Sequence, residues 1–399
     1  MINRHTQKMP LTLMVVTSAL IGFLILLGFL SEDMQPAETT HVDEYTRLLT
    51  MIEELYIGEY SEAELHEAAM HALVSGLDIW SFYMTPEEYA SFLESSNNRY
   101  AGIGVLVAID DDDGGMAVQG VYSESPAEIG GVLPGDIITH IDGESVSGMT
   151  LSQMTAMLAR PQGEYILLTV RRDDSNYLEL RVMYGEVFTD PVQKAIIDGD
   201  IGYIKLSNFE GESGDRFIYA VEDLVQEGVQ GFIYDVRGNG GGAVIELTQI
   251  LDYLLPEGEI FIHVSKDGEE RVTMSDAGWL DMPAVVLVNR HSFSAAEFFA
   301  ALLGEYGYAK IVGEQTTGKS YSQTTHGLPG GGALHISTGQ YMTKNRVSLF
   351  EAGGITPDYE VDISDEDFTL LRTGRLEFED DEQLQTAINI LRGEIQVRN

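Results

Sequence analysis

Residues 232–254, with the sequence FIYDVRGNGGGAVIELTQILDYL, decide the fold class of this chain. The stretch predicts a short apolar strand that ends at Asp235, then a glycine-rich turn, then a helix with apolar residues at helical spacing. Strands and helices continue to alternate from residue 199 to about residue 342. Such an order predicts right-handed crossovers and an α/β fold with a largely parallel sheet.

The neighbouring elements of this sheet are also predicted from apolar runs. Strands are expected over Ile201–Leu206, Val285–Val288 and Lys310–Val312, and a helix is expected over 294–306. In an open α/β sheet, ligands bind beyond the carboxyl ends of the strands. The loops that leave these ends are therefore the first candidates for a functional site.

Changes of pattern divide the chain into five regions. They are an apolar N-terminal segment (1–31), a helical region (42–98), a region of short strands and glycine-rich turns (99–185), the alternating core (190–362), and an acidic segment with a terminal helix (363–399). The length of 399 residues and the apolar content of 44% suffice for several hydrophobic cores. We therefore expect a multidomain α+β protein built around an α/β core.

Composition excludes several classes of protein. With 23 basic and 64 acidic residues, the net charge is −41, so a nucleic acid would be repelled and is not an expected partner. No cysteine is present, which excludes thiol catalysis, cysteine-ligated zinc and disulfides. His66 and His71 lie five residues apart, a spacing that points them in different directions on a helix. Neither a metal site nor a cofactor is expected.

The N-terminus predicts a membrane anchor. Arg4, His5 and Lys8 precede an uncharged, apolar run of 21 residues from Pro10 to Leu30, and acidic residues follow it. This length spans a bilayer as a helix and exceeds the apolar core of most cleavable signals. Positive charge before the run predicts a single-pass protein of the cell membrane, with the rest of the chain outside the cytoplasm. Cleavage of the segment is the alternative.

Three loops at the predicted strand ends carry candidate catalytic groups. The first, 235–242, offers successive backbone amides suited to an oxyanion. The second, 289–297, puts Ser294 at the start of a helix, where amides and the helix dipole favour negative charge. The third, 313–323, carries Lys319. Each loop also has a purely structural interpretation. The glycines of the first loop could form only a turn, Ser294 could only cap the helix, and Lys319 could be only a surface charge.

The third loop allows a further alternative. Residues 313–320, GEQTTGKS, fit the phosphate-loop pattern G-x-x-x-x-G-K-[ST] at every position. A phosphate loop needs a helix directly after it, and Pro329 with the three glycines that follow argues against one. A P-loop nucleotide-binding protein is therefore the weaker alternative.

Together, the loops resemble those of the carboxy-terminal processing peptidases, which are tail-specific serine proteases with an embedded PDZ domain. The similarity covers residues from about 42 to 394. The motifs that carry it are Asp235-x-Arg237-Gly238-Asn239-x-Gly241-Gly242, Ser292-x-Ser294-Ala295-x-Glu297, Gly313-Glu314-x-Thr316-x-Gly318-Lys319, Gly354-Ile355-x-Pro357-Asp358, and Ser125-Pro126-Ala127 with Pro134-Gly135-Asp136. Their order and spacing make the resemblance specific.

The resemblance implies a role for each candidate residue. Ser294 corresponds to the nucleophile of the family, Lys319 to its general base, and Gln323 to the residue that orients the lysine. The backbone amides of Gly241 and Ala295 correspond to the oxyanion donors. The choice among the three consecutive glycines of the first loop stays open.

A serine–lysine pair makes a physical demand on its surroundings. An unperturbed lysine, with a pKa of ~10.4, is protonated at neutral pH and cannot accept a proton. Burial without a carboxylate partner can lower this pKa by about 3 units, so Glu297 and Glu314 are expected to point away from Lys319. His291 and His326 flank the same loops, and His326 is the rival base in a serine–histidine arrangement.

By the same resemblance, the region 99–185 is expected to hold the C-terminal tail of the substrate by strand addition. Its carboxylate-binding loop is predicted at Gly102, Ile103, Gly104 and Val105. The helix that carries Met154 and Leu158 is predicted to line an apolar pocket for the last side chain, and a purely structural role in the core is the alternative. The expected substrates are proteins with apolar, unstructured C-termini.

The sequence therefore predicts a membrane-anchored serine endopeptidase that cleaves proteins near their C-termini, with its catalytic part extracytoplasmic. A non-catalytic PDZ scaffold that binds tails without cutting them is the alternative from another class. Residues 77–81 lack the Pro-His pair usual in the family, a departure that concerns substrate gating more than the dyad. No pattern in the chain predicts its oligomeric state.

Overall fold

The computed structural model describes residues 40–110, 114–173, 176–276, 278–372 and 375–398. Within these ranges, no helix combines the length and the apolar character that crossing a membrane requires. The predicted anchor belongs to the first residues of the chain and lies outside the described part.

Three helices and one strand precede the β-rich region. The helices are α2 (His41–Leu55), α3 (Glu62–Ser75) and α4 (Pro86–Ser95), and both α2 and α4 begin with a capping box. The expectation of helices alone is wrong at β1 (Phe82–Met84). This strand pairs antiparallel with β18 (Ala333–Met342), a partner so far along the chain that local periodicity does not reveal it.

A six-stranded sheet forms the centre of the core, in the order β10-β11-β12-β15-β16-β19. In this sheet β11, β12, β15, β16 and β19 run parallel, and β10 runs antiparallel at one edge. This confirms the prediction of a largely parallel sheet. The strands are β10 (Val192–Ile197), β11 (Ile201–Leu206), β12 (Gly231–Asp235), β15 (Ala284–Val288), β16 (Ala309–Gly313) and β19 (Tyr359–Glu360).

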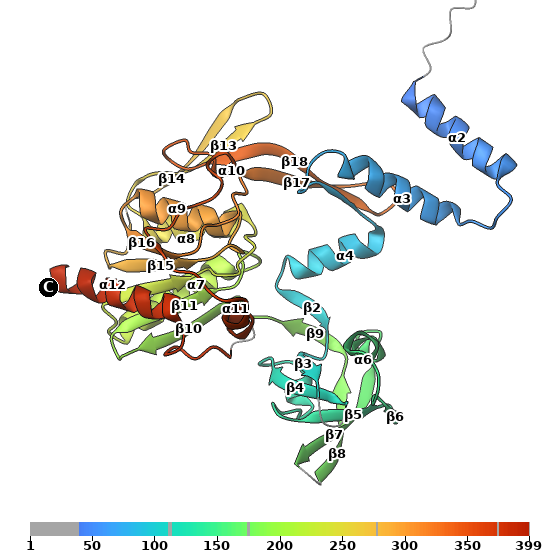
Figure 1. Ribbon diagram of the computed structural model, residues 1–399, viewed down its shortest axis with the longest axis horizontal. Coiled ribbons are helices and arrows are strands. Elements are labelled where there is room, and N and C mark those ends of the chain that lie inside the picture. The colour runs from blue at the N-terminus through green and yellow to red at the C-terminus, as the bar shows by residue number, and fades with distance from the viewer. Residues whose placement is uncertain (1–39, 111–113, 174–175, 277, 373–374, 399) are drawn as a thin grey trace, which may run out of the picture. The chain divides into compact units, whose positions relative to one another are not determined.

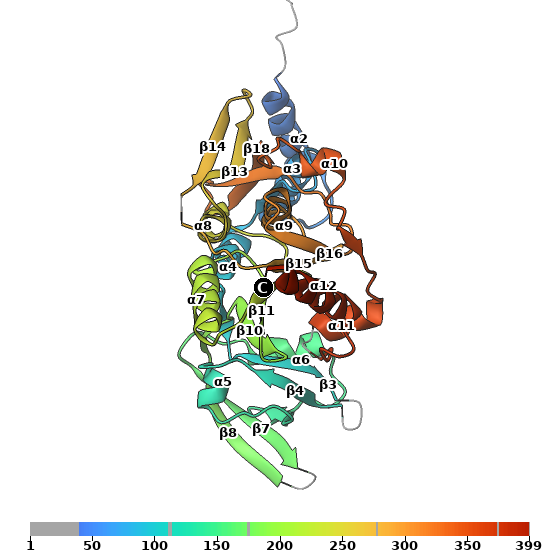
Figure 2. The same ribbon diagram turned by 90° about the vertical axis from the view of Figure 1, so that its left-hand side faces the viewer.

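Helices cover both faces of this sheet (Figure 1 and Figure 2). They are α7 (Ser213–Gln226), α8 (Val244–Leu254), α9 (Ala295–Glu305) and α12 (Glu382–Arg398). Phe232 and Tyr234 of β12 belong to the hydrophobic cluster that includes α7, α8 and α9, whereas Ile233 between them belongs to the cluster that includes α12. Because side chains alternate along a strand, the two clusters lie on opposite faces. The three candidate loops leave the carboxyl ends of the strands in this three-layer core.

A second sheet of five strands was not predicted. Its order is β1-β18-β13-β14, and β17 also pairs with β18. The new strands are β13 (Gly258–Ser265), β14 (Glu270–Ser275) and β17 (Tyr321–Gly327). Most side chains of β14, β17 and β18 are exposed or half-buried, so these strands lack the apolar runs that mark the central sheet. This sheet supplies one wall of the candidate site described below.

The β-rich region contains its own six-stranded sheet, in the order β3-β4-β5-β7-β8 with β6 paired to β5. Its elements are β3 (Val105–Ile109), β4 (Met116–Val121), α5 (Pro126–Ile129), β5 (Ile137–Ile141), β6 (Glu144–Ser145), α6 (Leu151–Leu158), β7 (Tyr165–Asp173) and β8 (Asn176–Met183). The two-stranded sheet of β2 (Arg99–Gly102) and β9 (Gly185–Phe188) joins the two ends of the region. In the described residues β3 pairs with β4 only, so one of its edges is open.

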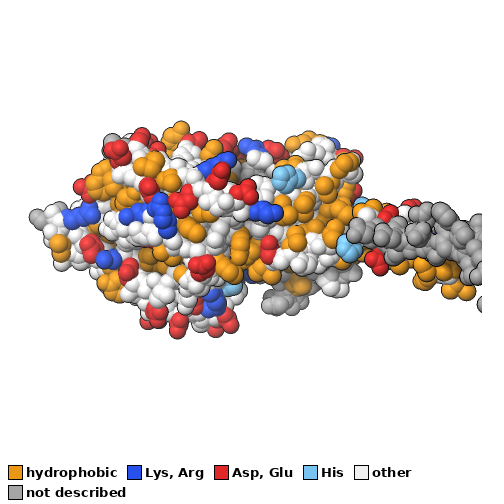
Figure 3. Space-filling model, turned by 90° about the horizontal axis from the view of Figure 1, so that it is seen from above, with side chains coloured by type: hydrophobic (Ala, Val, Ile, Leu, Met, Phe, Trp, Pro, Cys, Tyr) orange, Lys and Arg blue, Asp and Glu red, His pale blue; other side chains and the backbone are white. Residues whose placement is uncertain are grey.

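Two short helices complete the described elements, α10 (Leu349–Ala352) and α11 (Asp365–Arg372). On the face shown in Figure 3, acidic side chains are scattered among apolar and basic ones. On that face the excess of acid expressed in the net charge of −41 does not gather into one patch.

Candidate active site

Ser294 occupies the N-cap position of α9, directly after the loop that leaves β15. Its backbone has φ 59° and ψ −125°, a conformation that non-glycine residues rarely adopt and that therefore stores strain. The amide of Glu297 donates to the carbonyl oxygen of Ser294 at 2.9 Å, and the N–H of Ser294 donates to the Glu297 carboxylate at 2.9 Å. These two bonds fix the start of the helix at Ser294.

Ser294 opens into a cavity of about 350 Å³ that also receives Lys319 and Gln323. Ala295 and two glycines of the first loop, Gly240 and Gly242, line the same cavity. Its remaining walls are mostly aromatic and aliphatic, from Phe82, Phe92, Val244, Leu247, Phe261, Phe298, Tyr321 and Tyr341. The structure therefore brings the three predicted catalytic side chains, from two separate loops, to one largely apolar cavity.

Glu297 ties the serine loop to the lysine loop. Its buried carboxylate accepts the backbone N–H of Ser294 at 2.9 Å and that of Lys319 at 2.8 Å through one oxygen. The other oxygen accepts the N–H of Gly318 at 2.6 Å and the hydroxyl of Thr316. Burial raises the pKa of Glu297, and the four hydrogen bonds oppose this shift. The carboxylate is thus directed at the backbone of both loops and away from the lysine amine.

Lys319 lies half-buried against aromatic side chains. Its Nζ is 4.6 Å from the ring centroid of Trp80 and 5.9 Å from that of Phe293. Burial lowers the pKa of Lys319, while the charges of Asp78 and Glu297 partly oppose the shift. Among the described ion pairs none involves Lys319, so no carboxylate fixes the ammonium form. A lowered pKa is the condition that a general-base lysine must meet.

The segment that lacks the Pro-His pair supplies part of this environment. Burial acts to raise the pKa of Asp78, but hydrogen bonds from the backbone of Trp80 and Ser81 and from the Ser81 hydroxyl outweigh it, and the pKa is lowered. The amide of Gln323 donates to the hydroxyl of Ser337 at 3.2 Å, and the N–H of Ser337 donates to Ser81 at 3.1 Å. Gln323 is therefore held by this serine network, not by Lys319.

The first loop differs from the prediction in one respect. Gly241 has φ 91° and lies against Ser294, since a Cβ at this position would be 2.8 Å from Cβ of Ser294 and 2.9 Å from N of Ala295. Its own N–H donates to Oδ1 of Asn239 at 2.8 Å. This hydrogen bond directs the amide to Asn239, so the assignment of Gly241 as an oxyanion donor requires a change of partner. Gly242 and Ala295 line the cavity, whereas Gly241 does not.

The two histidines expected near the site, His291 and His326, do not line the cavity, and a third histidine does. His291 stacks on Phe368 with centroids 4.5 Å apart, and His326 is exposed with Nε2 3.0 Å from the hydroxyl of Thr324. Neither lines the cavity. His335 of β18 does line it, and burial together with the charge of Lys319 lowers its pKa. Sequence reasoning missed His335 because its strand belongs to the unpredicted sheet and has no recognisable motif.

The phosphate-loop alternative fails on structural context. Strand β17 begins at Tyr321, where a phosphate loop requires a helix. Ser320 is buried, and its hydroxyl accepts the N–H of Phe350 at 2.9 Å. The residues 313–320 therefore connect two strands and present Lys319, not a phosphate cradle.

The β-rich region supports part of the predicted tail site. Val105 begins β3, the strand with an open edge, and Gly104 has φ 83° with no room for a Cβ beside Ser125. Gly102 and Ile103 are buried.

The predicted pocket residues on α6 lie in the core of the region. Met154 is 0% exposed and Leu158 is 8% exposed, and both belong to its hydrophobic core. This burial agrees with the structural alternative, a role in the core, and the pocket for the last side chain stays a prediction. An amphipathic helix pattern does not distinguish a core residue from a pocket residue.

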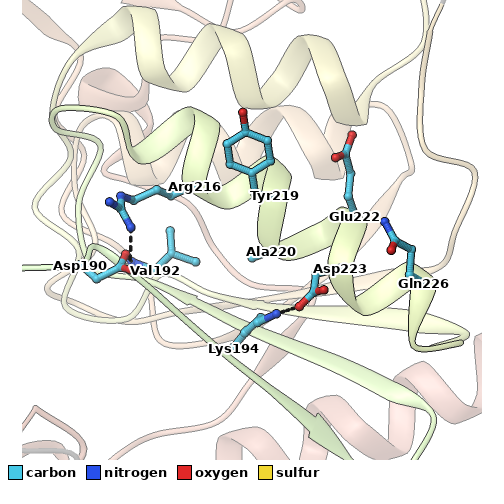
Figure 4. Close-up of a pocket in the computed structure, with 9 residues that line it drawn as sticks. All are labelled: Asp190, Val192, Lys194, Arg216, Tyr219, Ala220, Glu222, Asp223 and Gln226. Atoms are coloured by element: carbon cyan, nitrogen blue, oxygen red, sulfur yellow. Dashed lines mark hydrogen bonds and ion pairs between the residues drawn. The ribbon is translucent and has the colours of Figure 1, made fainter. Parts of the chain in front are cut away.

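Another hollow, of about 460 Å³, lies between β10 and α7 (Figure 4). Its two cations are paired within it, since Arg216 donates to Asp190 at 2.9 Å and Lys194 forms an ion pair with Asp223. It contains no nucleophile with a neighbouring base among the residues that line it. Although it is larger than the cavity at Ser294, it does not offer the same chemistry.

The chain is similar to known peptidases and to PDZ domains. Residues 200–361 match the model of peptidase family S41, and residues 118–172 match that of the PDZ domain. The chain is 29% identical over 378 residues to the carboxy-terminal-processing protease of Bartonella bacilliformis, covering 85% of this chain and 86% of that one. It is 27% identical over 357 residues to the carboxy-terminal processing protease CtpA of Bacillus subtilis, covering 88% and 76% of the two chains.

The fold has a counterpart among solved structures. A crystal structure from Bacteroides fragilis, described as an S41 protease, covers 84% of this chain and 90% of its own, with a TM-score of 0.56 and 18% identity. At this level of identity the likeness concerns the fold.

Proposed function

Since this chain is a serine-type peptidase of family S41 with a PDZ domain, we propose that it cleaves proteins near their C-termini by means of a Ser294–Lys319 dyad. The observation that carries the proposal is the shared cavity of the two side chains, together with the Glu297 carboxylate that binds the backbone of both loops. The lowered pKa of Lys319 supports its role as the base. In the described contacts no hydrogen bond joins the two groups, so the amine must approach the hydroxyl in the substrate complex.

The proposed reaction proceeds through an acyl-enzyme. The hydroxyl oxygen of Ser294 attacks the carbonyl carbon of the scissile amide while its proton passes to the neutral amine of Lys319. The C–N bond then breaks, and the ammonium returns this proton to the leaving amine. Water attacks the ester in the same manner, which releases the new C-terminus and restores the serine. The amide of Ala295 and one amide from residues 240–242 would stabilise the oxyanion.

Substrate choice is proposed to begin at the open edge of β3. An extended tail can add there as a strand, because the backbone groups of that edge have no partner strand in the described residues. The turn at residues 102–104 precedes this strand, as a carboxylate-binding loop should. The test compares the rates at which a substrate tail and its C-terminally amidated form are cleaved, since only the first carries the carboxylate that the loop is proposed to bind. Equal rates of cleavage for the two would contradict this role.

A tail-trimming assay read by mass spectrometry tests the chemistry. The full chain is compared with Ser294→Ala, Lys319→Ala and His335→Ala on a protein with an apolar, unstructured C-terminus. The proposal expects trimming to disappear in the first two variants and to persist in the third. Trimming that survives in Lys319→Ala and vanishes in His335→Ala would assign the base to the histidine. Binding of tails without trimming by the unaltered chain would favour the non-catalytic scaffold.

The membrane anchor is proposed from the sequence alone. The apolar run from Pro10 to Leu30, with basic residues before it, has the length and charge of a single-pass anchor that leaves the peptidase outside the cytoplasm. Membranes washed with alkaline carbonate should retain the chain, and added protease should reach it from the outer face. A mature chain that begins near Ser31 and is found in the soluble fraction would contradict the anchor.

A further inference from the structure

Glu210 lies in the wall of the Ser294 cavity, on the segment that follows β11. Its backbone is fixed on both sides, because its N–H donates to Oδ1 of Asn208 at 2.9 Å and its carbonyl accepts from Nδ2 of Asn98 at 2.6 Å. The position of the side chain is therefore set by a held segment rather than by a free loop. Neither the catalytic chemistry nor the family motifs use this residue.

The segment is bonded directly to the glycine loop of the site. The N–H of Phe209 donates to the carbonyl of Gly241 at 2.8 Å, and the N–H of Ala243 donates to the carbonyl of Phe209 at 2.6 Å. Gly241 in turn lies against Ser294. A substrate whose scissile carbonyl lies at the oxyanion amides would place the residue that supplies this carbonyl next to the cavity that Glu210 lines.

The Glu210 carboxylate has no partner in the described part of the chain. It is half-buried, and no hydrogen bond or ion pair is formed there by its oxygens. Burial, and secondarily the charge of Glu246 on α8, raises the pKa of Glu210 to about 7. Glu246 is itself engaged, since its carboxylate accepts the N–H of Gly214 at 2.7 Å. Lys319 also lines the cavity, but no ion pair joins it or any other described cation to Glu210. A half-buried carboxyl group without such a pair, beside a second acid, is suited to a cation that enters from outside.

The rest of the wall determines what kind of cation fits. Val244, Leu247, Phe261 and Phe298 line the cavity, and the last three are buried. A side chain that enters must therefore place apolar carbon against them. Lysine and arginine meet both conditions, because they bury an apolar stem and keep the charge at the tip.

We propose that Glu210 sets the specificity of this cavity for a lysine or arginine side chain on the substrate residue that supplies the cleaved carbonyl. The inference rests on the proposed function, and it names a substrate class that neither the dyad nor the PDZ region defines. Glu210 acts on binding of the side chain and takes no part in proton transfer.

The test compares two peptide substrates that differ in one side chain. Both carry the same apolar tail, and at the residue before the cleaved bond one has lysine and the other norleucine, which has the same stem without the ammonium. The ratio of kcat/KM for the two is measured between pH 6 and pH 8 on the full chain. Lys319 and His335 also line the cavity, and their charges act on the lysine peptide more than on the norleucine peptide. The contribution of Glu210 is therefore the difference in the ratio between the unaltered chain and Glu210→Gln at each pH.

The variants are Glu210→Gln, which keeps the shape and removes the charge, and Glu210→Lys, which reverses it. Glu227→Gln is the matched control, because Glu227 is exposed at the end of α7 and does not line the cavity. The expected ratio is about tenfold in favour of lysine at pH 8. It should fall towards one at pH 6 and in Glu210→Gln, drop below one in Glu210→Lys, and stay at the original value in the control.

The outcomes distinguish this inference from the function on which it rests. Cleavage of both peptides with a ratio near one, or a ratio that Glu210→Gln leaves unchanged, overturns the role of Glu210 and leaves the peptidase activity standing. Failure to cut either peptide, or equal cutting by Ser294→Ala, overturns the dyad and this inference together. Thermal unfolding of each variant verifies that the ratios come from folded protein.

Discussion

Substitution of Glu297 by glutamine should displace the loop of Ser294 relative to the loop of Lys319, while both side chains of the proposed dyad are kept. The carboxylate accepts four hydrogen bonds, two at each oxygen, from Ser294, Thr316, Gly318 and Lys319. An amide keeps one oxygen, so two of these bonds are lost and an N–H group then faces two donors. At about 1.5–3 kcal/mol for each bond to a charged group, and with partial relaxation, we expect a loss of about 2–4 kcal/mol in the free energy of unfolding.

The kinetic effect should be larger than the stability effect suggests. The strained backbone of Ser294 is held by one of these bonds, and a misplacement of the reacting groups by ~1 Å costs about a hundredfold in rate. We therefore expect kcat to fall about a hundredfold while KM changes little. The charge of Glu297 also raises the pKa of Lys319, so its removal should move the acid limb of the pH–rate profile to lower pH.

Two measurements verify this prediction, namely thermal unfolding and the pH dependence of tail trimming. For a domain of 150–250 residues, 2–4 kcal/mol corresponds to a decrease in Tm of about 5–15 °C. Glu314→Gln is the control, because Glu314 pairs with Arg290 and the described contacts join it to neither Ser294 nor Lys319. If Glu297→Gln keeps its full kcat and its acid limb does not move, the carboxylate does not couple the two loops and the reasoning is refuted.

Three further predictions follow from single contacts. In the unaltered chain, kcat/KM should rise with pH to a plateau, and the midpoint of this rise should lie below the ordinary lysine pKa of 10.5, because only neutral Lys319 accepts the proton. Trp80→Ala admits water to the amine, so the midpoint measured by pH titration should move upwards. An unmoved midpoint would contradict the role of burial. Gly241→Ala should lower kcat by about a hundredfold, since the new Cβ meets Ser294 at 2.8 Å; steady-state kinetics equal to those of the parent would show that the loop can yield. Arg237→Met leaves two buried carboxylates without their cation and should cost about 3–5 kcal/mol in chemical denaturation; a loss below 1 kcal/mol would mean that the network relaxes.

Much of the core was predictable because its elements satisfy local and global demands together. β11, β12, β15 and β16 are apolar runs buried on both faces, so each is visible without its partners. Ser294 and Lys319 follow such strands, and the carboxyl ends of parallel strands lie along one edge of the sheet. Their convergence on one cavity therefore follows from topology, before any side chain is located.

The remaining features depend on contacts that sequence periodicity does not encode. His335 of β18 lines the cavity, and Trp80, which lies just before β1, contacts the amine of Lys319. Both positions depend on the pairing of β1 with β18, two strands of mixed polarity far apart in the sequence. The partner of the Gly241 amide depends on the rotamer of Asn239. The burial of Met154 depends on how closely α6 packs on its sheet. In each case the deciding quantity is a tertiary distance of a few ångströms.

The pairing of β1 with β18 has a consequence for the order in which the parts of the proposed active site are completed during synthesis. Trp80, whose ring lies beside the Lys319 amine, lies just before β1 in the chain, but β1 pairs with residues 333–335, which follow both Ser294 and Lys319. A ribosome-bound chain that contains Ser294 and Lys319 but ends before these residues lacks the pairing partner of β1. Under the proposed dyad, we therefore expect the surroundings that lower the pKa of Lys319 to be complete only after residues 333–335 have been synthesised.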